Sequence, residues 1–185
     1  MYILQTALWE HGVILWLEPS QIYTGTQEQL IEPMMNAVDH GLTLYSNEAQ
    51  HRTLKTSTHP LLFKFFNSDD VKIKGKPLLW DSPMVMFNSE SLQKDVMQWW
   101  LACSLDPNCI APERASKTGC RGWGRKRIVR NKQCHFYDLS VLSVLLYNRA
   151  NHDISDCMLY MPITTAMTQM NRKKYKPKIC ANNKI

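Results

Sequence analysis

The sequence has no long uninterrupted apolar run of the kind that a membrane-spanning helix needs. A span takes about 18 or more apolar residues, but the most apolar stretch, MYILQTALWEHGVILWL, is broken by Gln5, Glu10 and His11. The stretch also lacks a basic start and a small-residue cleavage site, which mark a secretory signal peptide. We therefore predict neither a membrane span nor a signal peptide in it.

The sequence also lacks Cys-x-x-Cys pairs, the tight spacing that structural zinc sites prefer. Its six cysteines include a close pair, Cys103 and Cys109, and a second pair, Cys120 and Cys134, that flanks a basic run. An even number of cysteines with local pairs favours disulfides, which form in oxidising compartments. The cysteines thus predict a secretory protein, although the opening residues carry no export signal.

What the chain does contain fits one folded domain with excess positive charge. It has 185 residues, is 44% hydrophobic and carries a formal net charge of +6. Such a charge suits a nucleic acid, an anionic membrane surface or a phosphorylated ligand, and does not choose among them. The basic residues come late, in one run from Arg121 to Lys132 and another from Arg172 to Lys178. The second run lacks apolar periodicity and is predicted to be a solvated tail.

The first half of the chain alternates helical and strand patterns. Residues 2–10 predict a helix that Gly12 ends, and residues 13–17, VILWL, predict a short buried strand. Residues 27–41 predict a helix interrupted near Pro33. Its expected inner face consists of Leu30, Met34, Met35 and Val38. LTLYS, at 42–46, alternates as a strand does, and HPLLFKFF, from His59, predicts a short helix after the extended residues 53–58.

The second half contains the two clearest helical patterns. Residues 90–105 predict a helix capped by Asn88 or Ser89. Its apolar face comprises Leu92, Val96, Trp99, Trp100 and Cys103. At least one of its two tryptophans is expected in the core rather than stacked on a sugar. Residues 137–150 predict the other helix, with Asp138 as its N-cap and with Leu139, Leu142, Leu145 and Leu146 inside.

Shorter segments complete the pattern. PMVMFNS, at 83–89, is another short apolar run, and CMLYMPI, from Cys157, predicts an edge strand because it contains Pro162. Residues 107–132 are polar and predict a long loop held at its base by cysteines. Helices that alternate with short apolar strands predict an α/β fold.

Four motifs follow one another along the chain: WLEPS at 16–20, THP at 58–60, QWWLACSLDPNCIAP at 98–112 and CHFYDLSVL at 134–142. In order and spacing they resemble an uncharacterised animal family, abundant in nematodes, whose domain is similar to nucleotide-diphospho-sugar transferases of the GT-A type. The resemblance covers roughly residues 1–150, and the third motif is its most specific part.

This resemblance implies a GT-A-like (Rossmann-like) mixed sheet flanked by helices, without the N-terminal nucleotide-binding strands. Only the carboxyl-terminal part of the family domain has a counterpart here. The missing strands and a membrane anchor are therefore expected upstream, in which case the sequence is a truncated gene model or a degenerate copy. The implied layout is a partial GT-A-like domain at 1–162, with a basic loop at 113–133, and a basic tail at 163–185.

The implied activity is sugar transfer from a nucleotide-diphosphate donor to a glycan or glycoprotein acceptor, in the Golgi lumen or outside the cell. GT-A enzymes use a carboxylate at the end of a central strand to bind Mn²⁺ or Mg²⁺, which neutralises the leaving diphosphate. Glu18 and Ser20 stand where the family has Asp and Ser, and His135 is the candidate third ligand. A plain polar residue at the end of a strand is an equally weighted interpretation of Glu18.

The other site candidates each have a structural alternative. Asp138 matches the family's Asp before the late helix and would act as a general base or hold the acceptor, but the helix-cap interpretation is favoured. His59 lines the acceptor side or caps the next helix. Arg121 and Arg125 contact a diphosphate or belong to a solvated loop, and the loop is favoured.

Two further functional classes stay open. Residues 121–132 combine basic side chains with Trp123, as polyanion and nucleic-acid binders do. They contain a single aromatic residue and no known module, so nucleic acid is not the favoured partner. The third class is an inactive fragment whose disulfides only support its fold. The predicted disulfides are Cys103–Cys109 and Cys120–Cys134.

Overall fold

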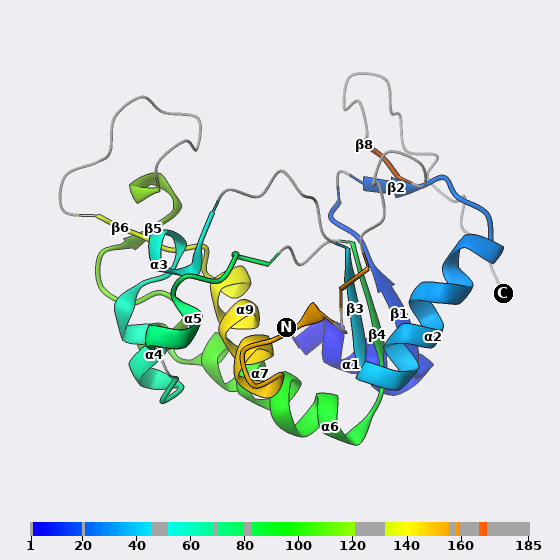
Figure 1. Ribbon diagram of the computed structural model, residues 1–185, viewed down its shortest axis with the longest axis horizontal. Coiled ribbons are helices and arrows are strands. Elements are labelled where there is room, and N and C mark those ends of the chain that lie inside the picture. The colour runs from blue at the N-terminus through cyan, green and yellow to red at the C-terminus, as the bar shows by residue number, and fades with distance from the viewer. Residues whose placement is uncertain are drawn as a thin grey trace, which may run out of the picture.

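The computed structural model describes residues 2–19, 21–45, 52–68, 70–79, 83–120, 132–155, 158–159 and 167–169. A mixed sheet lies toward one end of the molecule, and short helices with the small strands β5 and β6 lie toward the other (Figure 1). Helices and a small, mostly antiparallel sheet form a mixed α/β arrangement, which agrees with the predicted α/β class, while the GT-A-like fold stays a prediction.

The helices are α1 (Tyr2–His11), α2 (Ile31–His40), α3 (Leu54–Ser57), α4 (Pro60–Phe65), α5 (Asp70–Ile73), α6 (Glu90–Leu92), α7 (Gln98–Leu105), α8 (Pro107–Ile110) and α9 (Asp138–Arg149). Short helical turns are η1 (Glu28–Leu30), η3 (Lys117–Gly119) and the π-helical η2 (Gln93–Met97). The strands are β1 (Val13–Trp16), β2 (Gln21–Tyr23), β3 (Leu42–Tyr45), β4 (Met84–Phe87), β5 (Ala115–Ser116), β6 (Gln133–Cys134), β7 (Met158–Leu159) and β8 (Met167–Gln169).

The main sheet has the strand order β1-β4-β3-β7. β4 is antiparallel to both β1 and β3, and β7 is parallel to β3. β1, β3 and β7 therefore point in the same direction, and their carboxyl ends lie at the same end of the sheet. Among the strands within the described residues β7 is last in this order, as predicted for the segment from Cys157, while Pro162 lies outside the described residues.

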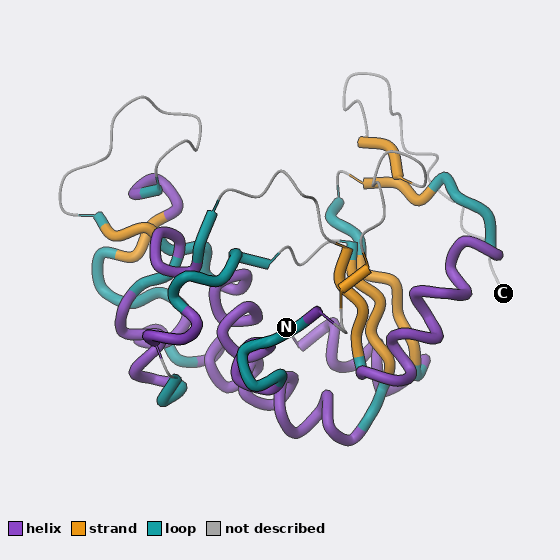
Figure 2. Tube along the Cα trace, in the orientation of Figure 1, coloured by secondary structure: helices purple, strands orange, loops and turns teal. Residues whose placement is uncertain are grey.

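Side chains alternate between the two faces of this sheet, as the period of a strand requires. Val13, Leu15 and Val85 pack with Ala37 of α2 on one face. On the other face Ile14, Leu42, Leu44, Met84 and Met86 join the main core with the remaining helices. Figure 2 shows α2 on one side of the sheet and most other helices on the other side.

α9 is the central helix of the main core. All nine residues from Leu139 to Tyr147 are buried, so the predicted inner leucines are confirmed. Two of these residues are serines with backbone partners. Ser140 Oγ donates to the Ser57 carbonyl at 3.0 Å, and Ser143 Oγ donates to the Leu139 carbonyl at 2.8 Å. Buried hydroxyls with such partners avoid the desolvation cost of an unpaired polar group.

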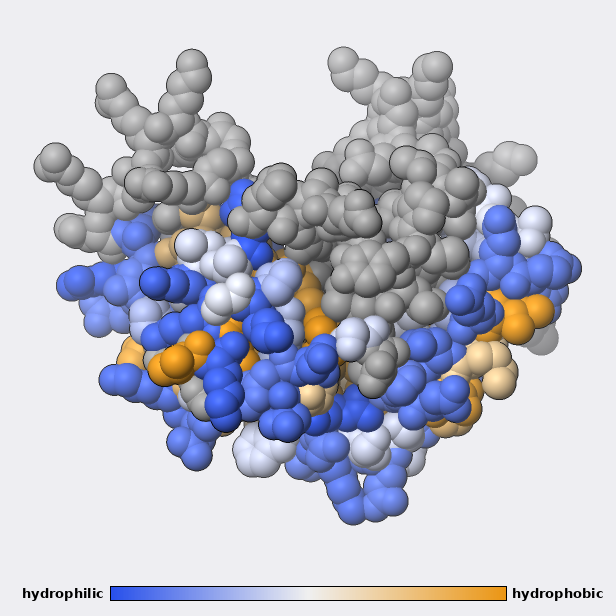
Figure 3. Space-filling view, viewed as in Figure 1, coloured by the Kyte–Doolittle hydropathy of each residue, from blue (hydrophilic) through white to orange (hydrophobic). Residues whose placement is uncertain are grey.

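The predicted inner face of α2 is wrong. Pro33 and Ala37 are buried, whereas Met34, Met35 and Val38 are exposed. Small residues let the helix lie close to the sheet, where Thr43 Oγ1 donates to the Pro33 carbonyl at 2.9 Å. Apolar areas are visible along the outer side of α2 (Figure 3). Pro33 also lies in the first turn of α2 rather than interrupting it.

Helix starts and loops bring further differences. Ser89 caps α6, as predicted, by accepting from Leu92 N–H. Residues 53–58, expected to be extended, contain α3 with a Thr53–Thr56 capping box. Asp138 was expected to be an N-cap, but it is the first residue of α9 and Tyr137, at φ 50°, precedes it. A carboxylate there still interacts favourably with the helix dipole.

The predicted loop and tail both contain regular structure. α8 and η3 lie in the loop, and β5 pairs with β6 in parallel at its base. In the tail, β8 pairs with β2. Cys103–Cys109 and Cys120–Cys134 form disulfides, which confirms both pairings and is typical of secreted or extracellular proteins. In the part of the chain described above, no helix combines the length and apolar content of a membrane span.

Candidate functional site

Glu18 lies just beyond the carboxyl end of β1, at the end of the sheet where β3 and β7 also have their carboxyl ends. Its side chain is exposed. The turn after it is closed by two hydrogen bonds: Glu18 N–H donates to Gln21 Oε1 at 3.0 Å, and Gln21 N–H donates to the Glu18 carbonyl at 2.8 Å. Its predicted neighbour Ser20 lies outside the described residues. The carboxylate is thus presented where open α/β sheets place ligands.

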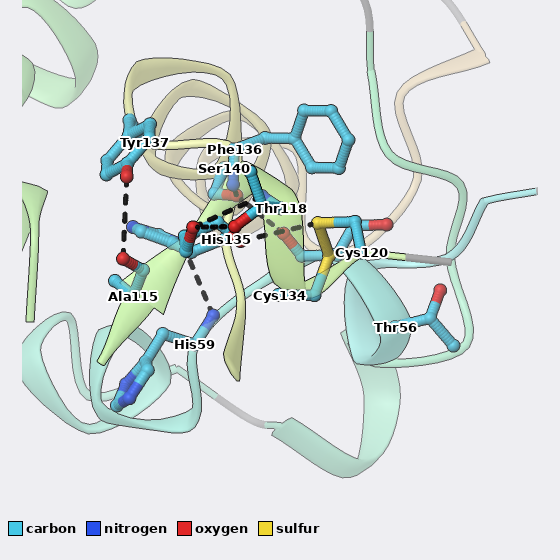
Figure 4. Close-up of a disulfide and its surroundings, with 12 residues drawn as sticks. Thr56, His59, Ala115, Thr118, Cys120, Cys134, His135, Phe136, Tyr137 and Ser140 are labelled. Carbon is cyan, nitrogen blue, oxygen red and sulfur yellow. Dashed lines mark hydrogen bonds between the residues drawn. A yellow bond between two sulfur atoms is a disulfide. The ribbon is translucent and has the colours of Figure 1, made fainter. Parts of the chain in front are cut away.

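His135 lies in the interior beside the Cys120–Cys134 disulfide, with its ring on the side of Ala115 and Tyr137 (Figure 4). Its Nδ1 accepts from the His59 backbone N–H at 3.2 Å, and its Nε2 lies 3.1 Å from the Ile110 carbonyl. A carbonyl only accepts, so Nε2 carries the proton and the ring is the neutral tautomer. Both ring nitrogens are engaged, so His135 has no lone pair for a metal in this arrangement.

His59 is also buried, and it caps α4. Its Nδ1 accepts from Leu61 N–H at 3.2 Å, and Pro60 fills the first helical position. The two histidine rings meet edge to face, with their centroids 6.3 Å apart. The cap interpretation of His59 is therefore confirmed, while the acceptor-side role stays a prediction.

Burial controls the protonation of both histidines. It lowers the pKa of His135 from 6.5 to about 4, against an opposing contribution from the Ile110 carbonyl, and nearby His59 lowers the pKa further. Burial also lowers the pKa of His59, while hydrogen bonds with the Gln133 side chain and the Glu113 backbone oppose the shift. At neutral pH both rings are uncharged, as a hydrogen-bonded structural pair requires.

The remaining candidates are spread over the molecule. Asp138 starts α9 directly after the His135 segment and is partly exposed. Arg121 and Arg125 fall outside the described residues, so their roles and the polyanion alternative stay predictions. The structure brings His59 and His135 together, whereas Glu18 follows a strand of the main sheet and Asp138 begins a helix beside β6 (Figure 1).

The described residues offer limited metal chemistry. No group of three or more His, Cys, Asp and Glu side chains within them is arranged to hold a metal ion. Mg²⁺ and similar ions are commonly bound by one or two carboxylates together with phosphates of the substrate. The exposed carboxylate of Glu18 fits that mode, but His135 does not.

Hollows also lie elsewhere, lined by described residues that the sequence analysis did not select as a site. One, of about 270 Å³, is lined by residues that include Asp39, His40, Arg149 and Asp153. A second, of about 570 Å³, lies between α4, α7 and α9. The polar residues of the second hollow include Asp95, from η2, and Asn148 and Arg149, from the end of α9. The two segments are far apart in sequence, and neither contains a motif that marks a site. Two of the hollow's lining residues were named beforehand, Trp99 as one of two tryptophans and Leu145 as an inner residue of a predicted helix.

No family model matches the chain, and no curated protein and no solved structure matches it. The family resemblance of its four motifs therefore stays a prediction.

Proposed function

We propose that the chain is part of a GT-A-like glycosyltransferase of the secretory pathway, and that it binds the diphosphate of a nucleotide sugar through a divalent metal. The position of Glu18 carries this proposal. An exposed carboxylate follows an apolar strand at the end of the sheet where three strands of one direction have their carboxyl ends. Ligands of open α/β sheets collect at the carboxyl ends of strands.

Glu18 is the residue that would hold Mn²⁺ or Mg²⁺, with the donor phosphates as further ligands. The metal would supply charge neutralisation of the departing diphosphate. Asp138, partly exposed at the start of α9, follows the His135 segment and not a strand of the main sheet, so its acceptor role stays a prediction of the family resemblance and no step is assigned to it. His135 is left out of the metal site because backbone groups engage both of its ring nitrogens.

The test is calorimetric titration of the disulfide-bonded chain with UDP, in Mn²⁺ and in EDTA. We expect binding in Mn²⁺ that EDTA abolishes. Glu18→Ala should weaken the Mn²⁺-dependent affinity about 10-fold or more, since the metal would lose its protein carboxylate. Glu18→Asp, which restores the residue of the resembling family, should retain it.

Glu10→Ala is the matched control, because Glu10 is another exposed carboxylate, at the end of α1. It should bind UDP as the unmodified chain does. The proposal fails if the unmodified chain shows no metal-dependent UDP binding, or if Glu18→Ala binds as tightly as Glu10→Ala.

A further inference from the structure

The second hollow, between α4, η2 with α7, and α9, is a surface groove with the size and lining of a ligand site. Its volume is about 570 Å³, and small-molecule sites span roughly 300–1,000 Å³. Of its lining residues Leu145 is buried in the core, and Phe66, Asn148 and Arg149 are partly buried. Figure 1 shows α4 toward the opposite end of the molecule from α2. We infer that this groove binds a neutral carbohydrate, with a sugar ring against Trp99 and its hydroxyls on Asn67 and Asn148.

Exposed aromatic rings are the first observation behind this inference. Trp99 is 49% exposed and Phe65 is 46% exposed, and both line the groove from different elements. The adjacent Trp100 is buried in the core, so α7 has its apolar anchor without Trp99. Broad aromatic faces left in water are favourable contact surfaces. The C–H face of a pyranose ring is flat, apolar and of matching size.

Two asparagine amides provide the polar side of the groove. Asn148 Nδ2 donates to Ser68 Oγ at 2.8 Å, which orients its amide. Asn67 lies at φ 47° after α4, and its backbone N–H donates to the Lys64 carbonyl at 3.1 Å. An amide both donates and accepts, as a sugar hydroxyl does. The Asn148 amide is already oriented and would bind with a smaller loss of conformational entropy, while the backbone bond of Asn67 fixes the chain from which its amide projects.

Charge in the groove favours a neutral ligand over an anionic one. Its lining contains one acid, Asp95, and one base, Arg149. These two side chains pair at 3.8 Å, and Arg149 Nη2 also donates to Ser91 Oγ at 2.9 Å. The guanidinium is therefore already engaged, and a phosphate or sulfate would meet the Asp95 carboxylate. Carboxylate and guanidinium groups in such pairs still accept and donate hydrogen bonds at their edges.

The backbone next to the groove is irregular. η2 is π-helical from Gln93 to Met97, between α6 and α7. It carries Asp95, and Trp99 follows in the first turn of α7. π-Helical turns are rare and occur frequently at functional sites. This irregularity supports a ligand role for the face that holds Asp95 and Trp99.

The experiment is calorimetric titration of the disulfide-bonded chain with chitotriose and with mannotriose, without metal or nucleotide. At least one of these neutral trisaccharides should bind. Trp99→Ala should weaken that binding about tenfold, since a stacked ring is lost. Asn67→Gly, which keeps the backbone conformation but removes the amide, should weaken it about threefold.

Trp9→Ala is the matched control, because Trp9 is 65% exposed on α1 and does not line the groove. It should bind the trisaccharide as the unmodified chain does. The inference does not depend on transferase activity, and no metal enters the assay. It is overturned if neither trisaccharide binds, if only a sulfated heparin tetrasaccharide binds, or if Trp99→Ala and Asn67→Gly both bind normally. Circular dichroism checks that each variant folds. If Trp99→Ala does not fold, the result with Asn67→Gly alone decides.

Discussion

At the scale of single residues, the His59–His135 pair holds two distant segments together only in its uncharged form. Nδ1 of His135 must accept from the His59 backbone N–H, while Nε2 donates to the Ile110 carbonyl. A proton on Nδ1 would set two N–H groups against each other in a buried site. The pair therefore links the start of α4 to β6 at neutral pH and weakens this link in acid.

This arrangement predicts that stability falls as the pH falls below 6.5. The folded-state pKa of His135 is about 4, below its ordinary 6.5, so the unfolded chain binds a proton at a pH where the folded chain does not. The free energy of unfolding should drop by about 2 kcal/mol between pH 7 and pH 5 from His135 alone. His59, whose pKa is also lowered, adds to the drop. Urea denaturation over this pH range measures it.

His135→Gln keeps a donor for the Ile110 carbonyl but does not titrate, so its stability should depend much less on pH in this window. His11→Gln, at an exposed position on α1, should keep the full dependence. An unchanged pH dependence in His135→Gln would contradict the structural account of the pair.

The distance between partners decides which residue roles could be predicted from sequence. The disulfides join cysteines 6 and 14 residues apart, and His59 caps a helix through Leu61, two residues away. The cysteine partners are local, so spacing was sufficient to pair them, whereas for His59 spacing left both the cap and the acceptor-side role open. The partners of His135 are 25 and 76 residues away, and no local pattern shows that they occupy its ring nitrogens. Helical spacing likewise placed both Trp99 and Trp100 on one face, but packing buried only Trp100.

At the scale of elements, α2 shows where hydrophobic periodicity misleads. Its large apolar residues Met34, Met35 and Val38 face outward, and the small Ala37 faces the sheet. Close approach of the helix to the sheet favours small residues, and the hydroxyl of the buried Thr43 donates toward oxygens of α2, the Pro33 carbonyl and Asn36 Oδ1. A pattern that scores only hydrophobicity cannot weigh this preference, although it located the helix and its end at Gly41 correctly.

The ends of α1 and α2 predict a graded response to alanine. Gly12 and Gly41 both have positive φ, 75° and 84°. A Cβ on Gly41 would also lie 3.0 Å from Ser89 Oγ and 3.2 Å from Leu92 Cβ, whereas a Cβ on Gly12 would meet nothing within 4 Å. Gly12→Ala should cost about 1 kcal/mol through backbone strain. Gly41→Ala should cost about 2–3 kcal/mol, because crowding adds to that strain.

Gly75→Ala is the matched control, since Gly75 has open space around its Cβ position and no positive φ. It should change stability by less than about 0.5 kcal/mol. Chemical denaturation of the three variants gives the order directly. Equal losses of stability in Gly12→Ala and Gly41→Ala would contradict the predicted crowding of Gly41 by Ser89 and Leu92.

At the scale of the whole molecule, the strand order of the main sheet determines where Glu18 lies. The α/β class followed from alternating patterns, but the insertion of β4 between β1 and β3 did not, because strand order depends on pairings across the chain. That order places the carboxyl ends of β1, β3 and β7 at the same end of the sheet, where Glu18 is exposed. The candidate metal site and the groove at Trp99 then lie on different elements and can be tested separately.

The most direct test is the paramagnetic broadening of amide NMR signals when small amounts of Mn²⁺ are added with UDP to the ¹⁵N-labelled chain. The proposed function predicts that the signals of Leu17 and Glu18 broaden first, while those of His135 and Tyr137 stay sharp. Uniform broadening, or broadening that begins at His135, would contradict a metal site at the end of β1.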